Sequence, residues 1–304
     1  MHGRTPQEAL EQLARKALDA LFQQPPFHGR PDQRYIDKLD YELEQVRLMD
    51  YAAYFLTVNS IVTYARAQDI LCQGRGSAAN SVICYVLGIT SIDPVEHQLL
   101  FERFISPNRG EPPDIDVDFE HERREEVIQW IYHTYGHDHA ALTAVVSRFR
   151  ARGAVREVGK ALGLPEDMTG ALAGQVWGWS SEGVADAHVD ALNLDRSDPR
   201  LALTLELARE LIGTPRHLSQ HPGGFVLARD RLDGLVPVEP AAMAARWVVE
   251  WEKEDIEELG FMKVDILGLG MLGCMRRGFD LLGQHKGIAM TMASEPLQLS
   301  LIHI

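Results

Sequence analysis

Residues 113–119, Pro-Asp-Ile-Asp-Val-Asp-Phe, alternate acidic and apolar side chains. Successive side chains of a β-strand point to opposite faces, so we predict a strand with Asp114, Asp116 and Asp118 together on one face. Carboxylates this close repel one another, and Mg²⁺, a hard cation that prefers oxygen ligands, would neutralise them. The alternative is the charged, solvent-facing side of an edge strand. We favour a metal site, because three consecutive acids on one face are a costly way to protect an edge.

A further acidic position lies in the apolar segment 259–268, where Asp265 is the only acid. Burying an unpaired carboxylate is costly. A two-metal site for phosphoryl transfer also needs a carboxylate from a neighbouring strand, so we predict that Asp265 supplies it. Lys263 would share the face of Asp265, and a purely structural ion pair between the two is the alternative.

Residues 74–81, Gly-Arg-Gly-Ser-Ala-Ala-Asn-Ser, follow an apolar run and open a predicted helix over 78–87. Glycine lets the backbone approach a ligand closely, and a helix N-terminus offers free N–H groups to phosphate. Arg75 and Ser77 add donors. The letters also imitate a dinucleotide-binding fingerprint, but no second strand–helix unit with an acidic strand end follows. A phosphate cradle together with a metal-binding strand indicates nucleotide chemistry.

The composition limits the class of protein. A chain of 304 residues, 45% apolar and 24% charged, has the size of about two globular domains and excludes a disordered tail, a collagen-like fibre and a coiled-coil rod. Against 44 Asp and Glu there are 30 Lys and Arg, a net charge of −14 that disfavours indiscriminate phosphate binding. Without a long apolar run, paired cysteines or a signal core, we predict a cytoplasmic protein with no membrane span.

The pattern along the chain predicts a mixed α/β unit that is interrupted by helices. Helices are expected at 6–22 and 32–49 and a strand at 112–119; from 121 to 212 the pattern is helical throughout, and short β-like runs return within 223–265. The helical block is therefore an insertion between two halves of one unit. We also expect both ends to be cut, and residues 290–304, which lose all periodicity, to be a gene-end artefact.

Within the helical block, Arg148, Arg150, Arg152, Arg156 and Lys160 form a basic cluster in an otherwise acidic chain. Such a cluster either follows the phosphates of duplex DNA or is an ordinary solvated helix face. We favour contact with DNA.

Five motifs, in this order and spacing, resemble those of the bacterial DNA polymerase III alpha subunit family, over roughly residues 30–283. The motifs are Gly74–Ser77, Phe101–Phe104, Pro113–Phe119, His221–Gly224 and Lys263–Asp265. The resemblance implies an α/β (α+β) fold: a polymerase-beta-like nucleotidyltransferase palm with a mixed sheet, interrupted by a helical thumb insertion.

The resemblance also implies boundaries for these parts. The expected domains are an N-terminal helical lead-in at 1–50, the first half of the palm at 51–120, the thumb at 121–205, the second half of the palm at 206–266 and the start of truncated fingers at 267–304.

Carried over by motif, the family's catalytic carboxylates are Asp116, Asp118 and Asp265, which would hold two Mg²⁺ ions, while Asp114 belongs to the motif without being a principal ligand. The implied nucleotide-binding residues are Gly74, Arg75, Gly76, Ser77, Arg103 and Lys263. The residues expected to contact DNA are Arg148, Arg150, Arg152 and Lys160.

Segments 216–224 and 247–255 resemble the error-prone translesion branch of the family, and Gln220 stands where the replicase usually has Lys. The implied function is a DNA-directed DNA polymerase that adds dNTPs to the primer 3′-end of primer-template DNA. Its other partners would be a sliding clamp and translesion accessory proteins, bound through parts not in this chain. As a fragment lacking most of the fingers, the chain is not assured of activity alone. The alternatives are the replicative alpha subunit, a non-catalytic fragment that binds DNA or partners, and a template-independent nucleotidyltransferase.

Overall fold

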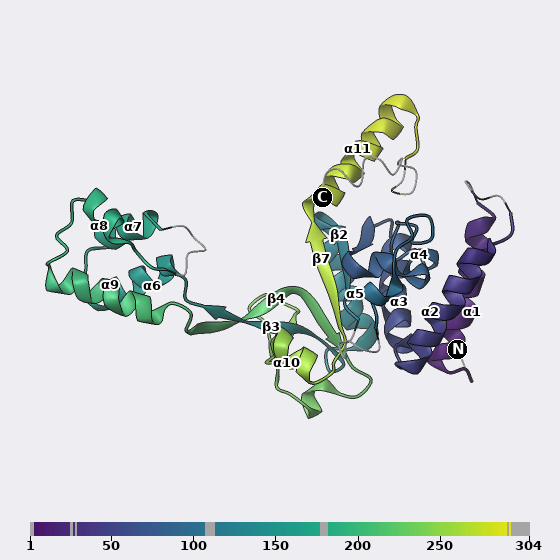
Figure 1. Cartoon of the computed structure of the whole chain (residues 1–304), viewed down its shortest axis with the longest axis horizontal. Coiled ribbons are helices and arrows are strands. Elements are labelled where there is room, and N and C mark those ends of the chain that lie inside the picture. The colour runs from purple at the N-terminus through teal and green to yellow at the C-terminus, as the bar shows by residue number, and fades with distance from the viewer. Residues whose placement is uncertain are drawn as a thin grey trace. The chain divides into compact units, whose positions relative to one another are not determined.

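In the computed structural model, the described residues are 3–24, 27, 29–106, 113–176, 182–290 and 292. They form two compact units (Figure 1): residues 145–219 make one, and the chain before and after them makes the other. Most of the predicted artefact at 290–304 lies outside the described residues. The larger unit carries both carboxylate segments and the glycine-rich turn, and the smaller one carries the basic cluster.

The strands form one seven-stranded mixed sheet in the order β1-β2-β7-β4-β3-β6-β5. Their bounds are β1 (Cys72–Arg75), β2 (Ile115–Glu120), β3 (Ala140–Arg148), β4 (Pro215–Leu227), β5 (Val238–Pro240), β6 (Trp247–Val249) and β7 (Lys263–Leu269). β2 and β7 are parallel neighbours, while β1 on one side and β4 on the other run antiparallel to them. The mixed sheet with its helices confirms the predicted fold class.

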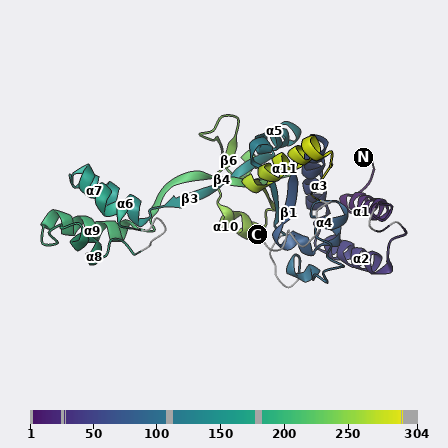
Figure 2. The ribbon, with the colours of Figure 1, turned by 90° about the horizontal axis from the view of Figure 1, so that it is seen from above.

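Helices α1 (Pro6–Phe22), α2 (Gln33–Leu48), α3 (Ala52–Ala67) and α4 (Val82–Val86) begin the larger unit and lie together (Figure 2). The same unit also contains α5 (Arg124–Tyr135), α10 (Lys253–Glu258) and α11 (Gly270–Lys286). α1 begins with a capping box between Thr5 and Glu8, with Pro6 at its first position. Within the described part of the chain, no helix combines the length and the apolar character needed to cross a membrane.

The apolar face of β2 lies in the main core. Ile115, Val117 and Phe119 are fully buried in one cluster with Phe55 of α3 and Ile128 of α5. This burial confirms the two-residue period expected for the segment, and it leaves the acidic side chains of β2 on the other face of the sheet.

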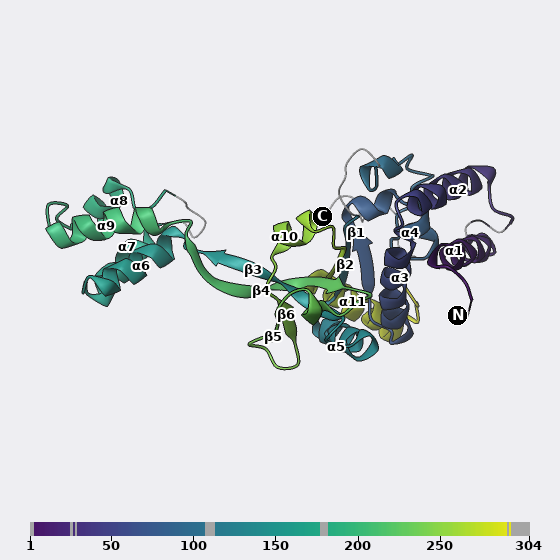
Figure 3. The ribbon, with the colours of Figure 1, turned by 90° about the horizontal axis from the view of Figure 1, so that it is seen from below.

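The smaller unit has a helical core of its own, and its helices gather in one group (Figure 3). They are α6 (Ala151–Ala161), α7 (Glu166–Gly174), α8 (Asp186–Ala191) and α9 (Pro199–Leu211). The helical pattern expected throughout 121–212 is wrong over 140–148, which form β3. Residues 140–144 are all buried, and a strand buried on both faces shows a continuous apolar run in place of alternation.

Candidate active site

The register of two parallel strands brings the distant carboxylates together. Asp116 of β2 lies directly opposite Asp265 of β7. Ligand oxygens of Asp114, Asp116 and Asp265 all lie within 4.8 Å of one another. The structure thus joins the two acidic segments as the metal-site hypothesis requires.

Negative charge exceeds positive charge in this cluster. The Lys263 Nζ atom lies 2.6 Å from Asp265 Oδ1 and 3.2 Å from Asp114 Oδ1, so one ammonium pairs with two of the three carboxylates. Burial, and then repulsion from Asp114 and Asp265, raises the pKa of Asp116 to about 6. Apart from the Lys263 ammonium, the buried Oδ1 of Asp265 has no donor among the described residues. A hard divalent cation with oxygen ligands fits this surplus of carboxylate oxygens.

Asp118, predicted as a third ligand, lies beside Arg75 of β1. The Arg75 Nε atom is 3.0 Å from Asp118 Oδ2, and one of its terminal nitrogens is 3.7 Å from Asp116 Oδ2. Burial raises the pKa of Asp118, against the opposing effect of Arg75. Asp114, which the motif ranked below the others, lies in the tight cluster instead. The role of Asp118 as a ligand stays a prediction.

A buried tyrosine, which the sequence analysis missed, ties the two carboxylate strands together. The Tyr54 hydroxyl accepts a hydrogen bond from the Ile115 N–H at 2.9 Å and donates one to the Lys263 carbonyl at 2.8 Å. Ile115 faces Val264 in the register, so the hydroxyl bridges β2 and β7 where their pairing begins. Tyr54 lies in an apolar helix, α3, where nothing local distinguishes it from an ordinary core residue.

The His-Pro-Gly-Gly motif packs against Asp265 from β4. The His221 Nδ1 atom accepts hydrogen bonds from the N–H groups of Gly223 and Gly224, and it lies 3.9 Å from Asp265 Oδ1. Burial lowers the pKa of His221, which favours the neutral ring. A Cβ atom on Gly224 would lie 3.0 Å from Asp265 Oδ1, so glycine is needed for this close approach.

A cavity of about 360 Å³, here called the cradle cavity, includes several predicted nucleotide-binding residues. It is lined by Gly76, Ser77, Ala79, Asn80, Leu99 and Arg103. Gly76 has a φ of +68°, which favours glycine, and a Cβ there would lie 3.8 Å from Asp116 Oδ2. The cradle cavity and the carboxylates therefore meet at this turn.

Gly74 serves a different purpose from the other glycine of the turn. A Cβ at Gly74 would lie 2.6 Å from the Ile89 carbonyl oxygen, which also accepts a hydrogen bond from the Gly74 N–H. Gly74 thus allows two backbone segments to approach each other, and it does not line the cradle cavity.

The helix predicted over 78–87 is divided, and its N-terminus is occupied. A 3₁₀ turn, η1 (Gly76–Asn80), precedes the short helix α4. The first N–H groups of α4, from Val82 and Ile83, donate to the buried carboxylate of Glu42 at 2.8 and 3.0 Å. The expectation that this helix offers free N–H groups to phosphate is therefore wrong. The donors that remain for a phosphate belong to the turn and to the nearby arginines.

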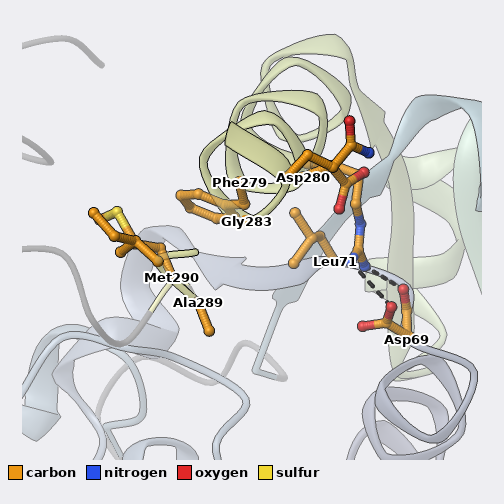
Figure 4. Close-up of a pocket in the computed structure, with 10 residues that line it drawn as sticks. Asp69, Leu71, Phe279, Asp280, Gly283, Ala289 and Met290 are labelled. Carbon is orange, nitrogen blue, oxygen red and sulfur yellow. Dashed lines mark hydrogen bonds and ion pairs between the residues drawn. The ribbon is translucent and has the colours of Figure 1, made fainter. Parts of the chain in front are cut away.

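A larger cavity of about 470 Å³ lies beside α11 (Figure 4). Asp69, Leu71, Phe279 and Met290 contribute to its lining, and Arg276 holds the Asp69 carboxylate at 3.1 Å. None of the predicted site residues lines it. The cradle cavity is therefore the one relevant to the predicted chemistry.

The predicted DNA-contacting residues gather at the start of the smaller unit. Arg152, Arg156 and Lys160 are exposed at four-residue steps on α6, so they form one stripe on its surface. Arg148 ends β3 and donates to the Gly213 carbonyl at 3.2 Å, and Arg150 immediately precedes α6. The basic cluster therefore includes the end of a strand as well as a helix face.

Comparison with known proteins agrees with the motifs. Residues 8–268 match the model of the bacterial DNA polymerase III alpha NTPase domain. The chain is 60% identical over 296 residues to Error-prone DNA polymerase 1 of Agrobacterium fabrum (strain C58 / ATCC 33970), covering 97% of the chain and 26% of that relative. It is 67% identical over 246 residues to Error-prone DNA polymerase 3 of the same strain, covering 81% of the chain and 22% of the relative. With the Error-prone DNA polymerase of Ruegeria pomeroyi (strain ATCC 700808 / DSM 15171 / DSS-3) the identity is 53% over 97% of the chain and 26% of the relative.

The chain thus spans about a quarter of the length of these curated relatives. The family match covers both carboxylate strands, the cradle turn and the helical unit between them. The chain therefore belongs to the family of the bacterial DNA polymerase III alpha NTPase domain.

Proposed function

We propose that this chain is the part of an error-prone DNA polymerase that holds its catalytic carboxylates. The observation that carries the proposal is the register of β2 and β7, which places Asp116 against Asp265 beside the cradle cavity. The names of the relatives at 53–67% identity support the error-prone branch. The reaction is attack of a primer 3′-hydroxyl on the α-phosphorus of a dNTP, with pyrophosphate as the leaving group.

In this proposal Asp116, Asp118 and Asp265 would hold two Mg²⁺ ions. Bound there, the ions would neutralise triphosphate charge and lower the pKa of the primer hydroxyl. Lys263, through its ion pairs with Asp265 and Asp114, orients both carboxylates.

The cradle cavity would receive the triphosphate. Ser77 and Arg103 line the cavity, and their hydroxyl and guanidinium groups would bind phosphate oxygens as hydrogen-bond donors. Arg75, held between Asp116 and Asp118, would join them from the strand side. Fixing the dNTP in this way supplies the orientation that phosphoryl transfer requires.

The separate helical unit at 145–219 supports a thumb in the middle of the chain, for which we expected 121–205. Its exposed stripe on α6 would bind phosphates of the primer-template duplex. With this division residues 121–144 would join the first half of the palm and residues 206–219 would join the thumb, while the lead-in at 1–50 and the start of the fingers at 267–304 stay predictions. Clamp and accessory partners would bind to other parts of the whole polymerase.

The test uses the complete enzyme, expressed from the whole gene, in Mg²⁺-dependent primer extension on intact and damaged templates. Asp116→Asn and Asp265→Asn should each lower the extension rate by about 10³-fold or more, because each removes a metal ligand. Asp233→Asn, at an acid of the η4 turn (Leu232–Gly234) that pairs with Arg231, is the matched control and should be near wild type. Normal extension by either site variant would refute the assignment, and extension without template would favour the template-independent alternative.

A further inference from the structure

Helix α2 is hydrogen-bonded to one wall of the cradle cavity and to the residues that directly follow the other. Lys38, Tyr41 and Glu42 are spaced by three and four residues, so they lie on one face of the helix. One wall of the cavity is the turn η1, and the other holds Leu99 and Arg103. The two walls are separate segments of chain; the side chains of α2 bind the second wall directly and the first through the residues that follow η1.

Glu42 holds the wall that contains η1. Its carboxylate is fully buried and accepts three hydrogen bonds: from the Ser81 hydroxyl at 2.8 Å and from the Val82 and Ile83 N–H groups at 2.8 and 3.0 Å. Ser81 directly follows η1, and its N–H donates to the Ala78 carbonyl within the turn. A fully satisfied buried carboxylate thus anchors the end of the turn that carries Gly76 and Ser77.

Tyr41 and Lys38 hold the opposite wall. The Tyr41 hydroxyl donates to Glu102 Oε1 at 2.7 Å, one residue before Arg103. The Lys38 ammonium donates to the Leu99 carbonyl and, at 3.1 Å, to the Pro94 carbonyl. The residues of this wall that line the cavity are therefore tied to the same helix as η1.

We propose that α2 fixes the separation of the two walls of the cradle cavity, and that Glu42 is a positioning residue for a nucleoside triphosphate. The inference rests on the proposed function of the cavity. A 16-residue helix is stiffer than either wall, so attachment of both walls to it presets their spacing before the ligand arrives. When an attachment is lost, the ligand must order the wall itself, and its affinity falls.

If Glu42 only stabilised the fold, any variant with a similar loss of stability would lose the same amount of dATP affinity. Tyr132→Phe is the control for this alternative. The buried Tyr132 hydroxyl donates to the Trp247 carbonyl at 3.0 Å and accepts from the Trp247 N–H at 3.1 Å. Neither residue lines the cradle cavity. Removal of the Tyr132 hydroxyl should destabilise the larger unit without releasing either wall of the cradle cavity.

The experiment is calorimetric titration of this chain with dATP in excess Mg²⁺, alongside thermal unfolding of each variant. We expect the dissociation constant to rise about tenfold for Glu42→Gln and about threefold for Tyr41→Phe. The dissociation constant of the double variant should rise by less than the product of the two single increases, because both changes release the same constraint. Tyr132→Phe should keep wild-type affinity at a comparable loss of melting temperature.

Equal losses of affinity for Glu42→Gln and Tyr132→Phe, or no loss for Glu42→Gln, would overturn the positioning role while leaving the proposed function intact. Failure of the wild-type chain to bind Mg²⁺-dATP would instead count against the proposed function, and the inference would fall with it. Should Glu42→Gln fail to fold, Tyr41→Phe, at an exposed residue, decides alone: wild-type affinity refutes the inference. In the complete enzyme, the KM for dNTP should rise while kcat stays within about twofold.

Discussion

Two acidic sites in the larger unit, the cluster of Asp114, Asp116 and Asp265 and the lone Glu42, have opposite surroundings. At the strand pair β2–β7, the Lys263 ammonium pairs with Asp114 and Asp265, and a terminal nitrogen of Arg75 lies 3.7 Å from Asp116. At α2, the carboxylate of Glu42 meets three hydrogen-bond donors. Burial raises the pKa of Asp116 to about 6 and that of Glu42 to about 7. The number of donors therefore distinguishes the sites: the clustered carboxylates have fewer donors than their oxygens can accept, which favours a bound cation, whereas Glu42 has three and serves the fold.

The two sites also depend on contacts between residues that are separated by different lengths of chain. The carboxylate cluster requires the long-range pairing of β2 with β7, which sets its geometry through a backbone register. Glu42 acts through a helix and a turn, and its effect on the cradle cavity is transmitted by hydrogen bonds. The carboxylate cluster and the hydrogen-bonded Glu42 should therefore respond differently to substitution, to metal and to pH.

The largest effect is expected for Mg²⁺ binding by Asp116→Asn. Removing one of the clustered carboxylates should weaken Mg²⁺ binding to this chain by about 10³-fold, or about 4 kcal/mol, measured by calorimetric titration. Without metal the variant should be at least as stable as the wild type at pH 7.5, because Asn removes repulsion with Asp114 and Asp265. A variant that binds Mg²⁺ like the wild type would show that the cluster does not hold the ion.

The next effect is the pH dependence that Glu42 gives to stability. Its pKa is raised from 4.5 to about 7 in the folded chain, chiefly by burial, against the lowering effect of its hydrogen bonds and of Lys38. The folded state therefore binds the proton of Glu42 more tightly than the unfolded state does. The extra free energy of unfolding that results is fully present below pH 4.5 and is lost as the pH rises through 7. The difference between these two pKa values corresponds to about 3 kcal/mol in the free energy of unfolding.

The measurement compares urea unfolding of the wild type and Glu42→Gln between pH 4.5 and 8. Gln does not titrate, so the wild type should lose about 3 kcal/mol more than the variant over this interval. The titration of Asp116 is common to both proteins and drops out of the difference. Parallel profiles would mean that the three donors, and not burial, control the charge of Glu42.

A smaller effect is expected for Tyr54→Phe, which removes the hydroxyl that joins β2 to β7. The Ile115 N–H and the Lys263 carbonyl would lose their partner, which costs about 1–3 kcal/mol of stability. Because these residues adjoin Asp114, Asp116 and Asp265, Mg²⁺ affinity should also fall by about tenfold. Tyr132→Phe should match the loss of stability without the loss of Mg²⁺ affinity. If both variants bind Mg²⁺ equally, the bridge does not position the cluster.

Short-range patterns in the sequence predicted two parts of this site: the face of the strand on which the acids lie, and the need of a buried acid for a partner. The two-residue period of 113–119 gave the correct faces of β2, and the cost of a lone buried acid correctly predicted that Asp265 lies beside Asp116. β3 was missed because a strand buried on both faces has no alternation. Tyr54 and Glu42 were missed because their partners lie on other elements, and no local pattern marks a tyrosine or a glutamate that will meet backbone groups there.

The smallest effect concerns the smaller unit, where the comparison extends to positive charge. Arg156 and Lys160 lie exposed on α6 with no ion pair among the described residues, whereas Arg216 pairs with Glu157 at 3.7 Å and lies over the ring of Phe149. If unbalanced charge marks ligand contact, Arg156→Ala should weaken duplex binding a few-fold at ~0.15 M salt. It should also lower the slope of log affinity against log salt by about 0.9, the value for one phosphate contact. Arg216→Ala, whose charge is already paired, should leave the slope unchanged. Fluorescence anisotropy of a labelled primer-template over a range of salt concentrations measures both, and identical slopes for the two variants would make the stripe an ordinary solvated face.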